Sequence, residues 1–299
     1  MNYKRFIKNK NTRILILKIL DFIPDILMIK IQYIISTNRI LNLKNPVRFT
    51  EKIQWYKLYY RNNLLTKCSD KFNVRDFVSK KGLSEILIPL YGVFNDYNDI
   101  NFEDFPETFV LKTTNGSHTN LICTNKSDLN FDFVKKEVNS WLSSWSSKMG
   151  REWGYYNIKP KLICEKLLEK DDNNDLIDYK FFCFNGVPYC IYAIVDRFTG
   201  KGLKLGIFDT DFELLPYNRS DINGLKEKIS KPENFDRMLE ISKILSSDFP
   251  FVRVDLYNVK GVIYFGELTF YDGSGYKGFT PDKFDFILGN QFNLPQIPL

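Results

Sequence analysis

An arginine and two carboxylates lie at alternating positions within the segment 249–272, which reads FPFVRVDLYNVKGVIYFGELTFYD. Apolar residues recur there at period two on either side of Val259-Lys260-Gly261, a pattern that predicts a β-hairpin with a three-residue turn. This register pairs Asn258 with Val262. It sets Arg253 opposite Glu267, with Asp255 one diagonal step away.

Arg253, Asp255, Glu267 and Thr269 would then share one face of the hairpin. Mg2+ takes oxygen ligands, usually one or two carboxylates plus substrate phosphates, and an adjacent Arg can hold a further phosphate oxygen. The pattern therefore predicts a metal and nucleotide site. A salt-bridged surface hairpin is the alternative, because Arg opposite Glu is a common cross-strand pair.

Two other segments offer cations. Ser69-Asp70 is expected to cap a helix that ends at Gly82 and places Lys71 and Arg75 on one face. Lys112 ends a short strand, FVLK, and the loop TTNGSHTN follows it. Loop amides and an ammonium can act on the same oxyanions, which suggests a phosphate clamp. The alternative interpretations are that Lys71 and Arg75 form a solvated helix face, and that the segment after Lys112 is an ordinary Gly/Ser loop.

A second hairpin is predicted in the segment 178–197, where Asn185-Gly186 is a strong type I′ turn signal. Its register sets Lys180 opposite Ile191 and on one face with Asp178. Lys180 is therefore a second candidate catalytic cation beside Arg253. Upstream, KLICEKLLE reads as a strand, and the helix expected at 232–245 covers the sheet.

The N-terminal region is apolar but interrupted by charges and by Pro24, so it predicts two helices and not a bilayer span. Lys4, Arg5, Lys8, Lys10 and Arg13 could hold these helices at an anionic membrane, although packing on their own domain is the preferred interpretation. No signal peptide is evident. A helix is expected over Thr50–Tyr60, with Thr50 as its N-cap and Glu51 in its first turn.

Composition narrows the classes of function. The chain has 299 residues, 44% hydrophobic content and a net charge of +6, so it can bury a sizeable core and suits anionic ligands. Its five Cys form no Cys-x-x-Cys pair, which favours reduced thiols in a cytoplasmic protein and argues against zinc. A single histidine, His118, argues against Ser-His-Asp hydrolysis and His-based metal clusters.

Taken in order, these motifs resemble the ATP-grasp superfamily, and more closely its TupA-like branch, which is associated with teichuronopeptide and polysaccharide biosynthesis. The resemblance runs from Asn45 to Gly289. It is carried by the segments NPVRFTEKIQWYKLY, SDKFNVRDFV, IPLYGVF, FPETFVLKTTNGS, DYKFFCFNG, FPFVRVDLYNVKGVIYFGELTF and ILGNQ. No single segment is diagnostic, but the ordered series is specific.

The resemblance implies roles for several of these residues. Lys71 and Lys112 would touch the ATP phosphates, and the loop Asn115, Gly116, Ser117 and His118 would cover them. Glu165, Lys166, Leu167 and Leu168 align with the segment that recognises adenine. Arg253 would stabilise phosphate, and Asp255 and Glu267 would bind Mg2+. Thr269 stands where the superfamily commonly has Asn as a further metal ligand. Branch members also tend to carry a His before the loop Gly-Ser and a Gly after it, which this chain lacks.

The implied reaction is a carboxylate–amine ligation through an acyl phosphate, with release of ADP and phosphate. The carboxylate would be a uronic acid of a surface glycan and the amine an amino acid or peptide, by analogy. Arg197, Lys201 and Lys204 are expected to grip the anionic acceptor, unless they form a solvated basic loop. The protein is expected in the cytoplasm or at the inner membrane face, without nucleic acid.

Two rival functions stay open. A glycosyltransferase would use Asp209-Thr210-Asp211, an Asp-x-Asp pattern that can hold a metal for a sugar nucleotide, although acidic residues also suit a hairpin turn. An inert glycan-binding or scaffold protein is the third class, but it gives the aligned cations and carboxylates no purpose.

The expected fold is α+β and ATP-grasp-like, with two antiparallel sheet subdomains flanked by helices. The predicted divisions are a helical region at 1–67, a small α/β segment at 68–105, and ATP-grasp subdomains at 106–168 and 169–299. Such boundaries carry an error of several residues.

Overall fold

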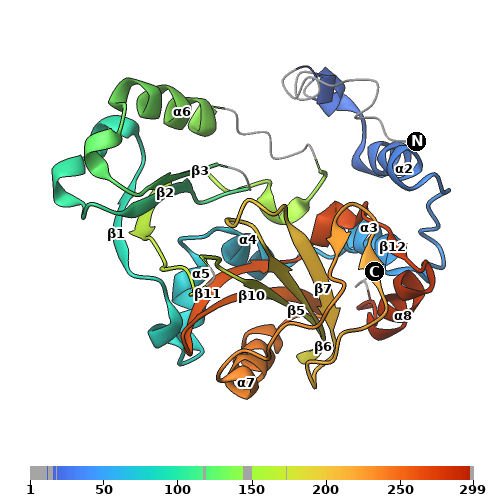
Figure 1. Cartoon of the computed structure of the whole chain (residues 1–299). Coiled ribbons are helices and arrows are strands. Elements are labelled where there is room, and N and C mark those ends of the chain that lie inside the picture. The colour runs from blue at the N-terminus through green and yellow to red at the C-terminus, as the bar shows by residue number, and fades with distance from the viewer. Residues whose placement is uncertain are drawn as a thin grey trace.

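Two β-sheets face each other across the middle of the molecule, and helices cover their outer sides (Figure 1). The computed structural model describes residues 12, 16–17, 19–116, 119–143, 150–172 and 174–296. Ser117 and His118 of the predicted phosphate loop, and the basic residues Lys4 to Arg13, lie outside these ranges. In the part of the chain that is described, no helix is both long and apolar enough to cross a membrane.

The smaller sheet has four antiparallel strands in the order β1-β4-β2-β3. They are β1 (Leu90–Phe94), β2 (Phe109–Thr113), β3 (Asn120–Cys123) and β4 (Leu162–Lys166). In β2 the residues Phe109, Leu111 and Thr113 are buried beneath α6 (Phe131–Ser143), while Val110 and Lys112 point to the other face. This alternation keeps one face in the core and turns Lys112 toward the second sheet.

The larger sheet has six strands in the order β11-β10-β5-β6-β7-β9, antiparallel except for the pair β7-β9. They are β5 (Asp178–Phe184), β6 (Val187–Val195), β7 (Lys204–Phe208), β9 (Asn223–Gly224), β10 (Phe251–Val259) and β11 (Val262–Thr269). A two-stranded sheet, β8 (Asn218–Arg219) with β12 (Phe279–Thr280), lies at its side. This α+β arrangement agrees with the expected fold class.

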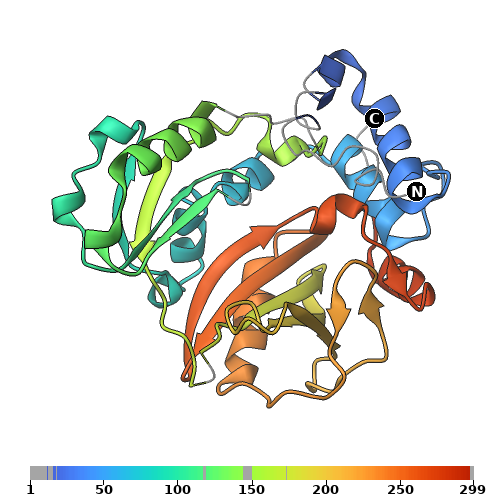
Figure 2. The ribbon, with the colours of Figure 1, turned by 45° about the horizontal axis from the view of Figure 1, so that its top comes forward.

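The two faces of the larger sheet have different neighbours. On one face, Phe181 packs on Phe235 of α7 (Phe235–Ser246), with ring centroids 6.1 Å apart. On the other face, Phe182 packs on Phe49 of α3 (Phe49–Tyr59), with centroids 6.0 Å apart. Figure 2 shows α3 over one end of this face, so the other end stays open toward the smaller sheet.

The remaining helices lie N-terminal to the smaller sheet or at the end of the chain: α2 (Asp25–Thr37), α4 (Asn63–Ser69), α5 (Val74–Lys80) and α8 (Lys283–Gln291). Short 3-10 turns occur at Leu20–Phe22, Ser84–Ile86, Tyr97–Asp99, Phe102–Asp104, Lys126–Asp128, Trp153–Tyr155 and Asp272–Gly275. The predicted break at Pro24 is confirmed, because α2 begins directly after it. β1 falls in the predicted segment 68–105 yet belongs to the smaller sheet, so the division at 105 stays a prediction.

The predicted N-cap of α3 is wrong by two residues. Arg48, and not Thr50, is the N-cap, and Glu51 accepts the backbone N–H groups of Val47 and Arg48 at 3.0 and 3.1 Å. The hydroxyl of Thr50 instead donates to buried Asp285 of α8 at 2.8 Å. A buried carboxylate needs hydrogen-bond donors, and this contact between α3 and α8 outweighs the local preference of Thr for the N-cap position.

The turn of the β10-β11 hairpin is one residue shorter than predicted. Lys260 and Gly261 alone form it, with φ of 50° and 83°, and Val259 pairs with Val262. Two successive positive φ angles are the geometry of a type I′ turn, whose twist matches that of the strands. The predicted pairing of Asn258 with Val262 is therefore wrong.

A bulge at Gly266 changes the pairing further along this hairpin. It places Asp255 directly opposite Glu267, and Arg253 opposite Thr269, so the predicted pairing of Arg253 with Glu267 is wrong. A Cβ on Gly266 would lie 3.0 Å from the carbonyl oxygen of Asp255, so glycine permits this close approach. The bulge brings the two carboxylates side by side.

The β5-β6 hairpin has the predicted Asn185-Gly186 turn, with φ of 50° and 79°. A bulge at Tyr189 of β6 then shifts the register, and Lys180 pairs with Tyr192 instead of the predicted Ile191. Lys180 keeps its predicted face, because it also pairs with Asp255 on β10. A row of charged side chains therefore crosses three neighbouring strands.

Candidate active site

A cavity of about 440 Å³ lies between the two sheets, within the usual range for small-molecule sites of about 300 to 1,000 Å³. Its apolar lining includes Ile88, Val110 and Leu168. Its described charged lining consists of the cations Lys71, Lys112, Lys166, Lys180 and Arg197, and the carboxylates Glu165, Asp178, Asp255 and Glu267. Most of the residues predicted from separate motifs therefore meet in one place.

Lys71 is held at the mouth of this cavity by the turn before α5. The carboxylate of Asp70 accepts the backbone N–H groups of Phe72 and Asn73, which is the predicted capping role, although the α-helix itself begins at Val74. Nζ of Lys71 then donates to the carbonyl oxygen of Gly116 at 2.5 Å. Burial lowers the pKa of Lys71, while Glu267 acts in the opposite direction.

Arg75 and Lys112 meet at Glu165. Nη1 of Arg75 lies 3.3 Å from one carboxylate oxygen of Glu165, and Nζ of Lys112 lies 2.6 Å from the other. The cationic face predicted for this helix therefore points into the protein and is not a solvated face. Glu165 has both of its oxygens in ion pairs in this structure.

The segment predicted to recognise adenine lies at the end of β4 and beside the cavity. Lys166, Leu167 and Leu168 line the cavity together with Glu165. The backbone N–H of Lys166 donates to the carbonyl oxygen of Pro89 at 2.9 Å. This bond fixes the direction of the chain as it leaves β4, so the residues that follow run along the cavity wall.

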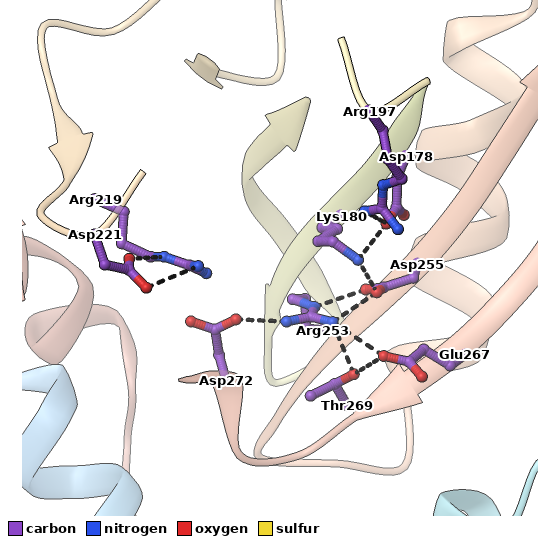
Figure 3. A network of polar contacts seen from close by, with 10 residues as sticks. All are labelled: Asp178, Lys180, Arg197, Arg219, Asp221, Arg253, Asp255, Glu267, Thr269 and Asp272. Carbon is purple, nitrogen blue, oxygen red and sulfur yellow. Dashed lines mark hydrogen bonds and ion pairs between the residues drawn. The ribbon is translucent and has the colours of Figure 1, made fainter. Parts of the chain in front are cut away.

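Asp255 is the most enclosed carboxylate of the lining, with 2% of its surface exposed (Figure 3). It accepts from Nε of Arg253 at 2.7 Å, from Nη2 of Arg253 at 2.6 Å, and from Nζ of Lys180. Lys180 also pairs with Asp178 at 2.7 Å. Burial raises the pKa of Asp255 to about 6, although Arg253 and Lys180 act against this.

Arg253 joins the carboxylates of this site into one network. Besides Asp255, its guanidinium donates to Asp272 at 2.5 Å, to Glu267 at 3.2 Å and to the hydroxyl of Thr269 at 3.0 Å. Burial disfavours its charge, but Asp255 and Asp272 outweigh burial and raise the pKa of Arg253. Arg253 lies behind the cavity lining, with its donors already engaged, so it positions the acidic side chains.

Glu267 is the carboxylate that reaches furthest into solvent, since 39% of its side chain is exposed. Burial favours its neutral form, but Lys71, Arg253 and Lys180 outweigh burial and lower the pKa of Glu267 to about 2. The hydroxyl of Thr269 donates to Glu267 at 2.9 Å. Thr269 is thus engaged with both Arg253 and Glu267, and it lies behind the cavity lining.

The donors present fit a hard divalent cation. Asp255 and Glu267 lie on directly opposed positions of β10 and β11, and both line the cavity. Among the described residues, no group of three or more His, Cys, Asp or Glu side chains could hold a metal by itself. Two carboxylates with substrate phosphates are nevertheless the usual environment of Mg2+, so the pair suffices when a polyphosphate is bound.

The residues predicted for acceptor binding are divided between two cavities. Arg197 lines the first cavity and pairs with Asp178 at 3.1 Å. Lys201 and Lys204 line a neighbouring cavity of about 720 Å³, where Lys204 pairs with Asp196 at 2.7 Å. The predicted grip by all three residues on one ligand would therefore require a ligand that extends across both cavities.

Sequence reasoning missed Asp272 as a member of the site. This residue follows the end of β11 and belongs to the turn Asp272–Gly275, in which Gly273, Ser274 and Gly275 have φ of 51°, 59° and 65°. Asp272 is 2% exposed and pairs with Arg253. The signal available in the sequence was the glycine-rich run DGSG directly after a strand that carries functional residues.

The comparisons with known proteins decide the family. The model for TupA-like ATP-grasp proteins matches residues 51–293. The chain belongs to the TupA-like ATP-grasp family. Comparison with curated proteins finds no match.

Solved structures similar to this TupA-like ATP-grasp chain include three ligases or synthetases. D-alanine–D-alanine ligase from Bacillus anthracis, complexed with ATP, shares 16% identity over 69% of this chain and 55% of its own, with a TM-score of 0.40. The corresponding ligase from Helicobacter pylori shares 16% identity over 76% of this chain and 61% of its own length, with a TM-score of 0.42. N5-carboxyaminoimidazole ribonucleotide synthetase shares 14% identity over 74% of this chain and 50% of its own length, with a TM-score of 0.44. The chain thus matches roughly half the length of these proteins.

The turn that carries Asp272 in this TupA-like chain is fixed from α3 by Lys57. Nζ of Lys57 donates to the carbonyl oxygen of Ser274 at 2.6 Å, to its hydroxyl at 3.0 Å and to Oε1 of Gln54 at 3.1 Å. Lys57 is 1% exposed, and this burial lowers its pKa from 10.5 to about 7. The position of Asp272 therefore depends on a buried amine.

This buried amine leads to a prediction about pH. The unfolded chain keeps the proton of Lys57 to about pH 10, but the folded protein keeps it only to about pH 7. Between these values the unfolded state binds more protons, so the free energy of unfolding should rise with pH, by up to about 1.4 kcal/mol per pH unit. Urea unfolding at pH 7, 8 and 9 should show this rise, and a smaller one in Lys57→Met.

The control for this prediction is Lys67→Met. Lys67 has 37% of its side chain exposed and pairs with Asp76 on the surface. The control variant should keep the slope of the unmodified protein. If the free energy of unfolding rose equally with pH in Lys57→Met and in the unmodified protein, Lys57 would not be the source of the rise.

Proposed function

We propose that this TupA-like ATP-grasp chain is an ATP-dependent carboxylate–amine ligase of surface polysaccharide biosynthesis. The observation that carries the proposal is the composition of the cavity between the sheets. Lys71 and Lys112 line it together with the carboxylates Asp255 and Glu267. Such a pairing suits a polyphosphate, whose oxygens would meet ammonium groups on one side and a carboxylate-bound metal on the other.

In this proposal the nucleotide lies along the cavity. Leu167 and Leu168, with Glu165 and Lys166, would contact adenine at the end of β4. Lys71, Lys112 and the loop from Asn115 to His118 would contact the phosphates. In the described part of that loop, Gly116 has a φ of 68° and lines the cavity. Its carbonyl oxygen already binds Lys71, so the loop and the lysine would act together.

Asp255 and Glu267 would hold Mg2+, which when bound would neutralise phosphate charge and orient the triphosphate. Lys180 lines the cavity beside Asp255 and would bind a phosphoryl oxygen. Arg253 would position the carboxylates instead of touching phosphate itself, because four side chains already occupy its donors. Thr269 would support Glu267, to which its hydroxyl donates a hydrogen bond.

The reaction would proceed in two steps. A carboxylate oxygen of the acceptor would attack the γ-phosphorus of ATP, the bond from that phosphorus to the bridging oxygen would break, and ADP would leave. The amine would then attack the acyl carbon, inorganic phosphate would leave, and the amine would lose its proton as the amide forms. Such phosphoryl transfer needs positioning and charge neutralisation more than a protein nucleophile.

An anionic sugar would suit the acceptor site. Arg197 lines the cavity, keeps 38% of its side chain exposed and pairs with Asp178, as Lys180 does. The net charge of +6 favours acidic substrates in general. A uronic acid as acceptor and an amino acid or peptide as amine donor are therefore the substrates we propose, for an enzyme acting in the cytoplasm.

The rival sugar-nucleotide site receives no support from its surroundings. The carboxylate of Asp209 accepts the backbone N–H groups of Asp211 and Glu213, at 3.0 and 2.8 Å, and closes the turn after β7. Neither Asp209 nor Asp211 lines either of the two described cavities. The Asp-x-Asp pattern is therefore explained by the hairpin turn that it forms.

Thermal unfolding with ligands tests the proposed function. Mg2+ with a non-hydrolysable ATP analogue at a hundred times its dissociation constant should add about 2.7 kcal/mol to the free energy of unfolding. Lys71→Ala should lose most of this gain, because Lys71 lines the cavity and, among the described residues, its Nζ donates a hydrogen bond to the loop carbonyl alone. Lys80→Ala, on the exposed side of α5 at 70% side-chain exposure, is the matched control and should keep it.

Thermal unfolding with ligands also distinguishes the ligase from a glycosyltransferase. Asp211→Ala should leave the response to the ATP analogue unchanged. Stabilisation by Mn2+ with a UDP-sugar, abolished in Asp211→Ala and accompanied by no response to the ATP analogue, would overturn the ligase proposal.

A further inference from the structure

The outer face of α2 is apolar and exposed to solvent. Its residues recur in adjacent pairs, one helical turn apart: Ile26 and Leu27, Lys30 and Ile31, Ile34 and Ile35. The apolar members of this α2 outer face are 38% to 50% exposed. Phe22, just before the helix, is 81% exposed. Scattered exposed apolar residues are ordinary, but a continuous helical stripe marks an interaction surface.

This face is not needed for the fold. The opposite side of α2 buries Met28, Ile29 and Tyr33, and Ile29 and Tyr33 pack in a small core with Leu41. The hydroxyl of Tyr33 bonds with that of Thr50 at 3.0 Å and ties α2 to α3. Figures 1 and 2 place α2 at the margin of the molecule, outside both sheets. The helix is thus apolar on two sides, and the part of the chain that the structure describes covers one of them.

The sequence that leads into α2 carries an excess of positive charge. Residues 1–30 hold seven Lys and Arg and only two Asp, at positions 21 and 25. The side chain of Arg151, which is 3% exposed, pairs with Asp25 at 2.9 Å and lies 3.7 Å from Asp21. Tyr156 also donates to Asp25, at 2.9 Å. The body of the protein therefore neutralises both acidic residues, and the basic residues of the segment stay in excess.

We propose that the α2 outer face binds the surface of a bilayer that contains anionic lipid, with α2 lying in the plane of the interface. Apolar residues on one face with surrounding Lys and Arg are the pattern of interfacial helices. α2 has 13 residues and so measures about 20 Å, shorter than a hydrocarbon core of about 30 Å. It therefore lies on the membrane and does not cross it.

A second copy of the chain fits this face less well. Two copies meeting through α2 would bring two segments of the same strong positive charge together, and like charges at a contact oppose association. An anionic bilayer instead attracts the same charges. The inference does not depend on the nucleotide site, since it uses only residues 1–41 and the contacts that fix them.

Co-sedimentation with vesicles tests the proposal. The full-length protein should bind vesicles that contain phosphatidylglycerol, bind pure phosphatidylcholine at least about tenfold more weakly, and lose binding as salt is raised. Leu27→Glu/Ile31→Glu should lower the partition into phosphatidylglycerol vesicles by about tenfold or more. The control is Val187→Glu/Val262→Glu, which adds the same charge at two hairpin ends with 59% and 53% exposure.

Thermal unfolding of both double variants should match that of the unmodified protein, because the changed side chains are exposed. Equal vesicle binding by the α2 variant and the control would overturn the proposal. So would a dimer, detected by light scattering, that Leu27→Glu/Ile31→Glu dissociates while vesicles bind none of the proteins; this result would assign the face to a second copy.

Discussion

Arg253→Ala is expected to lower the free energy of unfolding by about 3 to 5 kcal/mol, the usual cost of removing one partner from a buried ion pair. Arg253 is 7% exposed, and it pairs with Asp255 and Asp272, each of which is 2% exposed. The variant would leave both carboxylates without their main donor in a region of low dielectric constant. Urea unfolding at pH 7 measures the loss.

The control for this prediction is Arg237→Ala on α7. Arg237 pairs with Glu240 at 2.7 Å and with Glu85 at 3.3 Å, but 41% of its side chain is exposed. Solvent screens such pairs, so the loss should stay below about 1 kcal/mol. Equal losses in the two variants would show that the network around Arg253 is not a buried one.

Glu267→Gln is expected to weaken the Mg2+-dependent binding of an ATP analogue by about tenfold or more, and to lower the rate of ADP formation by about 100-fold to 1,000-fold, as for loss of one electrostatic contact in an active site. Gln has nearly the shape of Glu but no charge. Glu267 is ionised at neutral pH, because the surrounding cations lower its pKa to about 2. The variant therefore removes one of the two charges proposed to hold the metal.

Stabilisation by the analogue, measured while Mg2+ is titrated, reads out this effect without knowledge of the acceptor. The Mg2+ concentration for half-maximal stabilisation should rise in Glu267→Gln and stay unchanged in Glu240→Gln, whose carboxylate is 58% exposed on α7. ADP formation would be followed with a panel of uronic acids and amino acids. An unchanged Mg2+ dependence in Glu267→Gln would remove this residue from the metal site.

The hairpins of the larger sheet show where sequence reasoning succeeded. Alternating apolar residues and an Asn-Gly turn were sufficient to predict β5-β6, and similar alternation on either side of Val259-Lys260-Gly261 predicted β10-β11, although with a turn one residue too long. Periodicity also placed Arg253, Asp255, Glu267 and Thr269 on a common face, as their mutual contacts confirm. These features depend on neighbouring residues alone, which is why one sequence reveals them.

The register of both hairpins could not be predicted in the same way. Each contains a bulge, and one extra residue changes which side chains stand opposite each other without changing the alternation that is visible in the sequence. For β10-β11 the bulge decides the chemistry, because it makes Asp255 and Glu267 direct neighbours. Gly266 was a possible signal, since glycine inside a strand often marks a bulge.

The sequence by itself determined the two hairpins of the larger sheet, the Asn185-Gly186 turn, the order of the motifs and hence the family. Only the tertiary structure decided that Lys71 and Lys112 line one cavity together with Asp255 and Glu267, that Asp272 pairs with Arg253, and that Lys57 is buried. The physical reason is the range of the interactions. Turns and alternation follow from local backbone preferences, whereas ion pairs and burial follow from contacts between residues distant in the chain, which exist only once both sheets and α3 have packed.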